Sequence, residues 1–440
     1  WQRSDGGGPF RDITQAGDMA IYVLSTTSSA DDGARFSVRV SNRVGMAQSA
    51  PATLGVSFQV GRQTTRVSGG ARHSMALDDG GRLWSWGANE AGQAGRATES
   101  ASVVAPGMVS HSGQDLNDVA TFATGAHHTL ALLTDGSVLR WGSNERGQLA
   151  LEMSTAFSAE PVRLPDTTAA GRGVVAGEQS SGVLENFAGA PTRVWGMGAV
   201  GDGNVYGSAS WPPSTGEPSG PVHIAGMTLL RGSFGVAHSL AIRDDGRVFA
   251  WGSNGRGQLG LGDTVARLEP TQVPGLIDVV KVQAGQAHSA ALTLDGRVFT
   301  WGINDAHQLG GNGPQFTDRS TPSAVPLPGL AIDLACGADH CLALLFDGRV
   351  YGWGGNHFGQ VGDGTTADVA TPREITGRHW TVRAGGIGAG RHHSLAYDPL
   401  GNVWAWGHNG AGQLGWSAAQ ETQRALPVRV PGLPRVRPGA

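Results

Sequence analysis

The sequence is poor in charged residues, and in lysine above all. Only 15% of its 440 residues are charged, the formal net charge is −4, and Lys281 is the only lysine. No basic stripe or run of like charge occurs, so the sequence lacks the electrostatic footprint of a protein that binds nucleic acid or an anionic membrane. No apolar run reaches about 18 residues, and we therefore expect no membrane insertion.

Cysteine is nearly absent, since Cys336 and Cys341 are the only two. Two thiols do not complete a tetrahedral zinc site, so we expect no metal. Residues that flank a four-residue hairpin loop lie about 5.5 Å apart or less, within reach of a disulfide bond. Two interpretations stay open, a pair of small buried thiols or a disulfide across a tight hairpin. No phosphate-binding glycine loop occurs either, and we expect no cofactor.

Glycine, by contrast, is abundant, with 70 residues, and it recurs at regular intervals. The segment GQAHSAALTLDGRVFTWGINDAHQLG at 285–310 returns imperfectly at 70–95, 125–149, 177–201, 235–260, 337–362 and 390–415. Trp-Gly pairs follow one another at intervals of 50 to 56 residues, at Trp86, Trp141, Trp195, Trp251, Trp301, Trp353 and Trp406. A fixed period near 50 residues indicates a repeat architecture.

Each copy predicts about four short antiparallel strands. In one copy, Val279–Val282, Ser289–Leu294 and Arg297–Trp301 predict three strands, separated by the Gly-x-x-His reversal and an Asp-Gly turn. A proline-rich stretch such as 270–276 supplies the last strand. Both faces of the strands are apolar, as in Val-Phe-Ala-Trp at 248–251, which is typical of a sheet covered on both sides. Small sheets packed radially, as the blades of a β-propeller, meet this requirement.

The shared motif is Gly-x-x-His-Ser…Asp-Gly-x-Val…Trp-Gly-x-Asn-x-x-Gly-Gln-Leu-Gly, and it resembles the regulator-of-chromosome-condensation repeat. The resemblance covers about 66–434 and implies an all-β fold, a seven-bladed β-propeller over 66–440 that follows a linker at 58–65. The copy at 177–201 departs from the motif, because Ser180 replaces the His and no Asp-Gly turn is evident.

Residues 1–57 differ from the repeats and resemble the later half of a bacterial immunoglobulin-like domain. Trp1 matches the core Trp of its third strand, Phe36 stands where a corner Tyr is expected, and Val38 stands where a second Cys would be. The first two strands of such a sandwich are absent. Either the chain is part of a longer protein, or another chain donates the missing strands and the protein self-associates.

The His-Ser pairs and nearby Asp residues are the residue types of a hydrolase, but we expect them to be structural. Adjacent residues of a strand point to opposite faces, so His288 cannot activate Ser289. A nucleophile and its base would also not recur in six copies. We expect no catalytic residue and no enzymatic activity. We expect each Trp to fill the space between two blades and each His to bond backbone within its own blade; these His residues are His73, His128, His238, His288, His340 and His393.

Binding residues are expected where the copies differ. Strand counting places the Gly-x-x-His hairpins and the Asn-x-x-Gly loops at one end of the ring. We predict that a partner contacts the variable positions there and an aromatic pair in the long insertion of the third copy. The alternative is that these positions belong to ordinary solvated loops. The residues are Glu90, Arg146, Arg256, His357, Phe358, Tyr206 and Trp211. Among them, Phe358 and the arginines are the expected anchors.

These observations predict a non-enzymatic scaffold outside a bacterial cell, secreted or on the cell surface, that binds a protein or a glycan. The bacterial source is inferred from the use of arginine in place of lysine. Propellers of the resembled family include nucleotide-exchange factors and inhibitors of β-lactamase, which act by protein contact through one ring face. The alternative is a structural subunit of a surface filament or sheath, assembled by strand donation between chains.

Overall fold

The computed structural model describes two compact units, Trp1–Arg62 and Gln63–Ala440. The residues it describes are 2–4, 11–12, 35–37, 39–41, 46–48, 52–53, 66–96, 98, 100–152, 154–165, 171–185, 193–198, 222–224, 229–311, 316–376, 384–419 and 421–436. Within them, no helix is long and apolar enough to cross a membrane.

The first unit contains only short strands among its described residues. They form a four-stranded sheet in the order β2-β1-β3-β6 and a separate β4-β5 hairpin. Their bounds are β1 (Gln2–Ser4), β2 (Arg11–Asp12), β3 (Arg35–Ser37), β4 (Arg39–Ser41), β5 (Met46–Gln48) and β6 (Ala52–Thr53). Phe36 lies in β3, whereas Trp1 and Val38 lie outside the described residues. The immunoglobulin-like sandwich stays a prediction.

The second unit confirms the all-β, seven-bladed propeller. It consists of seven four-stranded antiparallel sheets, each built from four strands in chain order. We number these blades 1 to 7. Blade 1 has β7 (Val67–Gly69), β8 (His73–Leu77), β9 (Leu83–Ala88) and β10 (Ser102–Met108); blade 2 has β13 (Val119–Thr124), β14 (His128–Leu133), β15 (Val138–Ser143) and β16 (Phe157–Arg163); blade 3 has β17 (Gly171–Ala176), β18 (Ser180–Glu185), β19 (Arg193–Gly198) and β20 (Val222–Ile224).

The remaining four blades repeat this arrangement. Blade 4 has β21 (Leu229–Phe234), β22 (His238–Arg243), β23 (Val248–Gly252) and β24 (Arg267–Gln272); blade 5 has β25 (Val279–Ala284), β26 (His288–Thr293), β27 (Val298–Gly302) and β28 (Arg319–Ala324); blade 6 has β29 (Ala331–Cys336), β30 (His340–Leu345), β31 (Val350–Gly354) and β32 (Val369–Glu374); blade 7 has β33 (Gly386–Ala389), β34 (His393–Tyr397), β35 (Val403–His408) and β36 (Gln423–Arg429). A further hairpin, β11 (Ser110–His111) with β12 (Gln114–Asp115), follows blade 1.

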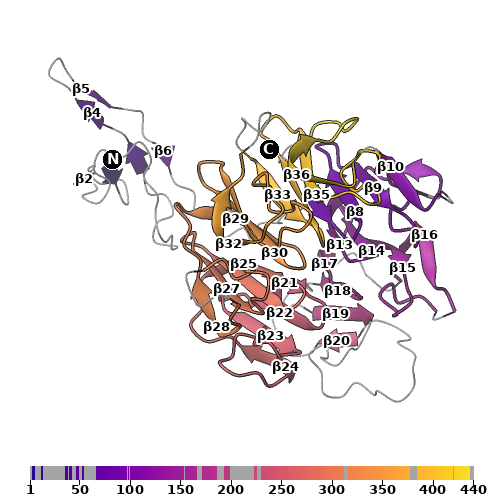
Figure 1. The fold of residues 1–440 in the computed structure, drawn as a ribbon, viewed down its shortest axis with the longest axis horizontal. Coiled ribbons are helices and arrows are strands. Elements are labelled where there is room, and N and C mark those ends of the chain that lie inside the picture. The colour runs from indigo at the N-terminus through magenta and orange to yellow at the C-terminus, as the bar shows by residue number, and fades with distance from the viewer. Residues whose placement is uncertain are drawn as a thin grey trace. The chain divides into compact units, whose positions relative to one another are not determined.

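The blades close into a ring by contact between blade 7 and blade 1 (Figure 1). The first strand of every blade contacts the first strand of the next blade, and β33 contacts β7. Two hydrogen bonds join blade 7 to blade 1. Arg391 N donates to Gly70 O, and Trp86 Nε1 donates to Gln413 O. All four strands of each blade are consecutive in sequence, so no blade is shared between distant parts of the chain.

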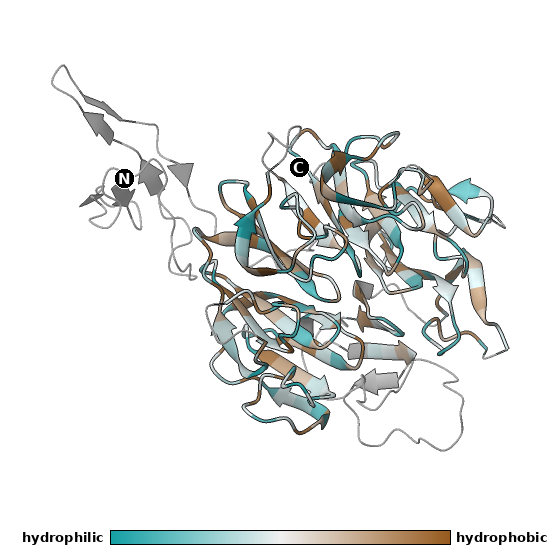
Figure 2. Ribbon diagram, in the orientation of Figure 1, coloured by the Kyte–Doolittle hydropathy of each residue, from teal (hydrophilic) through white to brown (hydrophobic). Residues whose placement is uncertain are grey.

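The apolar core lies between the blades. The second strands of blades 2, 5 and 6 are buried along their whole length, which agrees with sheets that are covered on both faces. Brown, hydrophobic segments recur along the blade strands in Figure 2. Six tryptophans of the repeats have no exposed surface: Trp86, Trp141, Trp251, Trp301, Trp353 and Trp406.

In blade 3, Trp195 packs between blades only partly buried, and Met197 takes the fully buried position. Ser180 pairs with Gly198 as His128 pairs with Gly142, so Met197 stands where Trp141 stands in blade 2. Met197 is buried at 2% exposure and packs with Leu130 and Leu132, whereas Trp195 lies two residues earlier and is half-buried. Side chains two residues apart lie on the same face of a strand, so a Trp-Gly pair shifted by two keeps the apolar pattern.

Candidate binding face

The six histidines of the motif bridge blades, which corrects the prediction that they bond backbone within their own blade. In blade 6, His340 Nε2 lies 2.9 Å from Ser394 Oγ of blade 7, and Ser394 Oγ donates to Gln360 O at 2.7 Å. The hydroxyl hydrogen is used by that carbonyl, so the imidazole Nε2–H donates to the hydroxyl oxygen. Equivalent pairs are His73–Thr129, His128–Ser181, His238–Ser289 and, closing the ring, His393–Ser74.

Burial favours the neutral form of five of these rings, those of His73, His128, His238, His288 and His393. Burial lowers the pKa of His73, His128 and His238 to about 3 and that of His288 to about 4. Like charge from neighbouring histidines adds to the effect at His73 and His238. Within the described residues, Nδ1 of every motif histidine has no hydrogen-bond partner, as expected of a ring whose only hydrogen is on Nε2.

Glycine makes room for each histidine. A Cβ on Gly337 would lie 2.3 Å from His340 Cε1 and 2.4 Å from Gly390 O of the next blade. Gly407, which follows the Trp of blade 7, has φ +99°, and a Cβ there would lie 2.7 Å from His392 O. The Gly-x-x-His and Trp-Gly elements of the motif therefore specify one close packing of two hairpins.

The Asn-x-x-Gly-Gln loops join five pairs of neighbouring blades. In blade 6, Asn356 is fully buried and its Oδ1 accepts from Val361 N at 2.9 Å, while Gln360 Oε1 accepts from Phe358 N. The Gln360 carbonyl then accepts from Trp406 Nε1 at 2.9 Å. The same Trp-to-Gln bond joins four further pairs of blades, through Trp86 and Gln413, Trp141 and Gln93, Trp301 and Gln258, and Trp353 and Gln308.

The hairpins and the Asn loops lie at the same end of the ring, as the strand count predicts. The first residue of the second strand pairs with the Gly at or next to the end of the third strand, for example His73 with Gly87. Ala88 N also donates to Arg72 O, which joins the hairpin to the start of the loop. We call this end the hairpin face. It comprises the turns at 70–72, 125–127, 177–179, 235–237, 285–287, 337–339 and 390–392, and the Asn loops that follow the third strands.

An aromatic and histidine cluster forms the hairpin face of blades 6 and 7. The ring of Phe358 lies 4.5 Å from that of His408 and 5.4 Å from that of His392. His392 Nδ1 lies 3.7 Å from Asp339 Oδ1, and Gln360 Nε2 donates to the same oxygen. Burial would raise the pKa of Asp339, but His340 and His392 outweigh it and hold that pKa below its usual range. Burial, with charge from His392 and Arg72, lowers the pKa of His408.

Ion pairs complete the hairpin face. Arg72 Nη1 lies 3.3 Å from Glu90 Oε1 in blade 1. Arg391 of blade 7 lies 3.1 Å from Glu178 of blade 3, although neither blade neighbours the other around the ring. This pair therefore spans the mouth of the central axis and fixes two hairpins that share no sheet.

The predicted contact residues fall into three groups. Arg146 is exposed on an Asn loop, and His357 is exposed with its Nε2 3.9 Å from Asp368 Oδ1. Glu90 and Arg256 are exposed but paired, with Arg72 and with Asp318. Phe358 is half-buried between the two histidine rings. Tyr206 and Trp211 lie outside the described residues. The sequence interpretation missed Asp339, His408, Glu178 and Arg391 as contact candidates; their positions in the hairpins and loops, where the copies differ, were the available signal.

Blade 6 carries a disulfide between Cys336 and Cys341. These residues are directly opposite in the β29–β30 hairpin, which settles the two interpretations of the cysteines in favour of the disulfide. Cys341 is fully buried.

Comparison with known proteins gives matches across the propeller. The family model described as the RCC1-like domain matches residues 193–438, and the regulator of chromosome condensation (RCC1) repeat matches 65–93, 80–132 and 119–148. The ultraviolet-B receptor UVR8 of Arabidopsis thaliana is 28% identical over 363 residues, which are 80% of this chain and 79% of the receptor. The secretion-regulating guanine nucleotide exchange factor of Bos taurus is 30% identical over 371 residues, 78% of this chain and 77% of that protein.

A solved structure shows the same fold. Prp20p of Saccharomyces cerevisiae superposes with a TM-score of 0.66 at 23% identity, over 78% of this chain and 84% of that chain.

Proposed function

The chain belongs to the RCC1-like domain family, and on this basis we propose that it is a non-enzymatic scaffold that binds another protein through the hairpin face. The relatives are a receptor and a guanine nucleotide exchange factor by name, which supports a regulatory or binding role. A protein partner follows more directly from these names than the glycan partner that the sequence leaves open.

The observation that carries the proposal is the separation of shared from varying residues. The buried His, Trp, Asn and Gln residues recur from blade to blade and hold the ring together. The hairpin and loop residues above them differ between blades. The residues one or two positions before the motif His are an example, with Arg72, His127, Gln286 and Asp339 in four different blades. Positions that are free to vary on a rigid scaffold are where binding residues concentrate.

The chemistry of the hairpin face fits a partner with an apolar anchor and mixed charge. Phe358 offers a half-exposed aromatic edge beside the neutral ring of His408, and both Arg72 and Arg391 lie on this face with carboxylate partners. Aromatic and arginine side chains are the residue types that most often dominate binding energy at protein interfaces.

A test reverses the charge of one arginine in an exposed ion pair at each end of the ring. Arg72, on the hairpin face, pairs with Glu90, and Arg297, at the opposite end, pairs with Asp295; their side chains are 45% and 62% exposed. Each is changed to Glu, and proteins captured from native extracts are compared by quantitative mass spectrometry. We expect Arg72→Glu to lose a partner that Arg297→Glu retains. Equal capture by both variants, or capture only of glycans, contradicts the proposal.

We further propose that the protein is secreted or on a cell surface. The Cys336–Cys341 disulfide supports this location, because disulfides persist in oxidising compartments. Alkylation of free thiols at the moment of cell lysis, followed by mass spectrometry of the peptide at 336–341, tests it. We expect both cysteines to resist alkylation in the native protein. Free thiols in most molecules would contradict an extracellular location.

The self-association predicted for residues 1–57 also stays a proposal. Analytical ultracentrifugation over a range of concentrations tests it. Growth of oligomers that stops when residues 1–57 are deleted would support strand donation, and a monomer at every concentration would exclude it.

A further inference from the structure

Blade 6 departs from the other blades at the residue that meets the histidine of its neighbour. In blades 1, 2, 3, 5 and 7 that residue carries a hydroxyl: Ser74, Thr129, Ser181, Ser289 and Ser394. In blade 6 it is Cys341, whose Sγ lies 3.2 Å from His288 Nε2. A second cysteine, Cys336, stands directly opposite it.

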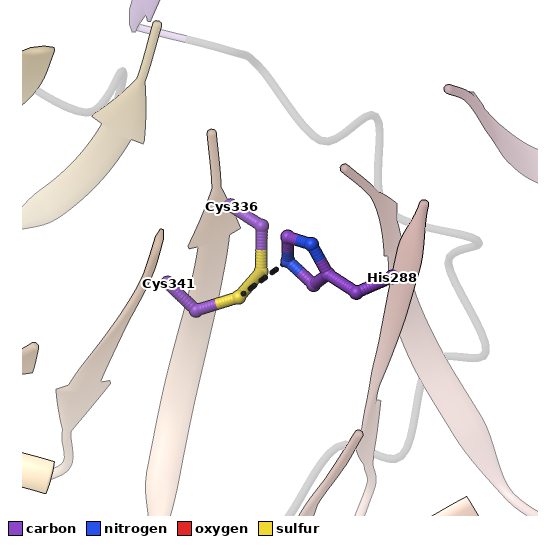
Figure 3. Close-up of side chains that lie close together, drawn as sticks. All are labelled: His288, Cys336 and Cys341. Carbon is purple, nitrogen blue, oxygen red and sulfur yellow. Dashed lines mark hydrogen bonds between the residues drawn. A yellow bond between two sulfur atoms is a disulfide. The ribbon is translucent and has the colours of Figure 1, made fainter. Parts of the chain in front are cut away.

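The three side chains converge on one point (Figure 3). The imidazole of His288 projects from blade 5 toward the two sulfurs of blade 6. The ligand atoms of His288, Cys336 and Cys341 all lie within 4.8 Å of one another. A first-row ion with a sulfur ligand at about 2.3 Å and a nitrogen ligand at about 2.0 Å holds those two atoms about 3.6 Å apart. The present spacing is therefore close to the spacing of a metal site.

From this geometry we infer that reduction of the disulfide converts the blade 5–6 junction into a binding site for a soft metal ion, monovalent copper. A dithiol reductant supplies two electrons and two protons, so that the S–S bond breaks, Cys336 and Cys341 become thiols, and the reductant becomes a disulfide. The copper ion then displaces the thiol protons and binds both sulfurs and His288 Nε2. In the oxidised protein the sulfurs are bonded to each other and the site is closed.

The fold holds the ligands in place after reduction. The Cα atoms of the two cysteines are 4.1 Å apart because β29 and β30 pair there, and this pairing does not depend on the S–S bond. His288 is confined by Gly285 and Gly337, since a Cβ on Gly285 would lie 2.1 Å from its Cε1 and 2.8 Å from Gly337 O. The site is therefore organised before any metal arrives.

The histidine can offer its nitrogen to a metal. A disulfide sulfur carries no hydrogen, so Nε2–H donates to Cys341 Sγ in the oxidised form. Metal binding requires the other neutral tautomer, with the hydrogen on Nδ1. Within the described residues Nδ1 of His288 has no partner, so the exchange leaves a buried N–H without an acceptor, a cost that the metal–ligand bonds must outweigh.

The ligand set suits monovalent copper. Structural zinc takes four ligands in a tetrahedron, and among the described residues this cluster has three. Thiolate sulfur and imidazole nitrogen are donors that suit monovalent copper, which accepts fewer ligands. Cys336 is half-buried on the first strand of its blade, which gives a reductant and the ion a route to the sulfurs.

The test is a competition for copper under anaerobic conditions. The full chain is reduced with a phosphine, which is itself removed, and is titrated with monovalent copper in the presence of bathocuproine disulfonate. Cys341→Ser is the matched control, because it places at position 341 the hydroxyl that the other blades have there. His288 then keeps a hydrogen-bond partner, but the metal loses one sulfur ligand. The oxidised wild-type protein is the second control, and circular dichroism in the near ultraviolet verifies that the reduced ring stays folded.

We expect the reduced wild-type chain to retain one copper ion per molecule and both controls to hold copper about 100-fold more weakly or worse. X-ray absorption should show two sulfur ligands and one nitrogen ligand. Equal retention by Cys341→Ser, a site with sulfur ligands alone, tighter binding of zinc than of copper, or unfolding on reduction would each overturn the inference.

Discussion

Blade 7 and blade 3 meet their preceding neighbours differently. Between blades 6 and 7, the Gln360 carbonyl accepts from both Ser394 and Trp406, and His340 donates to Ser394. Between blades 2 and 3, His128 still meets Ser181, but Met197 replaces the Trp and offers no N–H to the loop. On its other side, blade 3 has Ser180 in place of the His, and Ser180 Oγ is buried without a partner among the described residues.

The comparison separates two contributions to the ring. Apolar filling is kept in both regions, since Trp406 and Met197 are buried at 0% and 2%. The polar links are complete in one region and partial in the other. A blade can therefore lose some of its polar links and keep its place in the ring, provided that an apolar side chain fills the space between the blades.

Acidification should have the largest effect, and it acts on the junctions whose buried histidine has a lowered pKa. A histidine with a folded pKa of about 3 and an unfolded pKa of 6.5 binds no proton in the folded ring but does so on unfolding. Stability is therefore complete above pH 6.5 and falls as the pH drops toward the folded pKa, by about 1.4 kcal/mol per pH unit for each such histidine. Denaturant titrations between pH 7 and pH 4 measure this slope. A constant free energy of unfolding over that range would contradict the neutral, buried state of the rings.

Removing the filler should be the next largest effect, and it should be larger in blade 7. We expect Trp406→Ala to cost about 3–5 kcal/mol and Met197→Ala about 2 kcal/mol, because the indole leaves the larger cavity and also gives up its bond to Gln360. Thermal and denaturant unfolding measure both. A cost for Met197→Ala equal to or above that of Trp406→Ala would show that blade 3 is not the weaker junction.

Removing one hydroxyl sharpens the contrast further. Ser394→Ala leaves His340 Nε2–H without an acceptor and should cost about 1–3 kcal/mol. Ser180→Ala removes a hydroxyl that has no partner within the described chain, so it should be neutral or slightly stabilising. The same unfolding measurements apply, and equal destabilisation by the two variants would contradict the partners assigned to them.

Charge reversal on the hairpin face should affect stability least. Exposed ion pairs contribute about 0–1 kcal/mol, so Arg72→Glu and Arg297→Glu should each change the free energy of unfolding by about 0.5 kcal/mol or less. A differential scanning calorimetry trace measures the change. A large loss of stability in Arg72→Glu alone would mean that the hairpin face holds the ring together and is not free to vary for binding.

The sequence predicts the fold well because the repeat supplies the same information several times. The Trp-Gly period, the Asp-Gly turns and the two-sided apolar strands all indicate seven blades. The register of blade 3 is not recoverable from the pattern, since Trp195-Gly196 and Met197-Gly198 are both apolar-Gly pairs on one face of the strand. A single copy that differs from the motif needs its cross-strand partners before its residues can be aligned.

Contacts between blades are the other part that the sequence could not supply. The histidine and its Ser partner are separated by more than 50 positions, for example 53 between His128 and Ser181. The pattern within one copy suggests a partner in the same blade, and only the closed ring brings the next blade within reach. The pair of Arg391 and Glu178, 213 positions apart, depends on ring closure in the same way.

Shared residues build the ring, and we propose that varying residues of the hairpin face bind the partner. Capture by Phe358→Ser is compared with capture by Phe346→Ser, because Phe346 is a 53% exposed aromatic on the turn between β30 and β31, at the opposite end of the same blade. The account predicts that Phe358→Ser loses the partner while Phe346→Ser keeps it, with both proteins folded. Loss of the partner in Phe346→Ser and retention in Phe358→Ser would contradict the account.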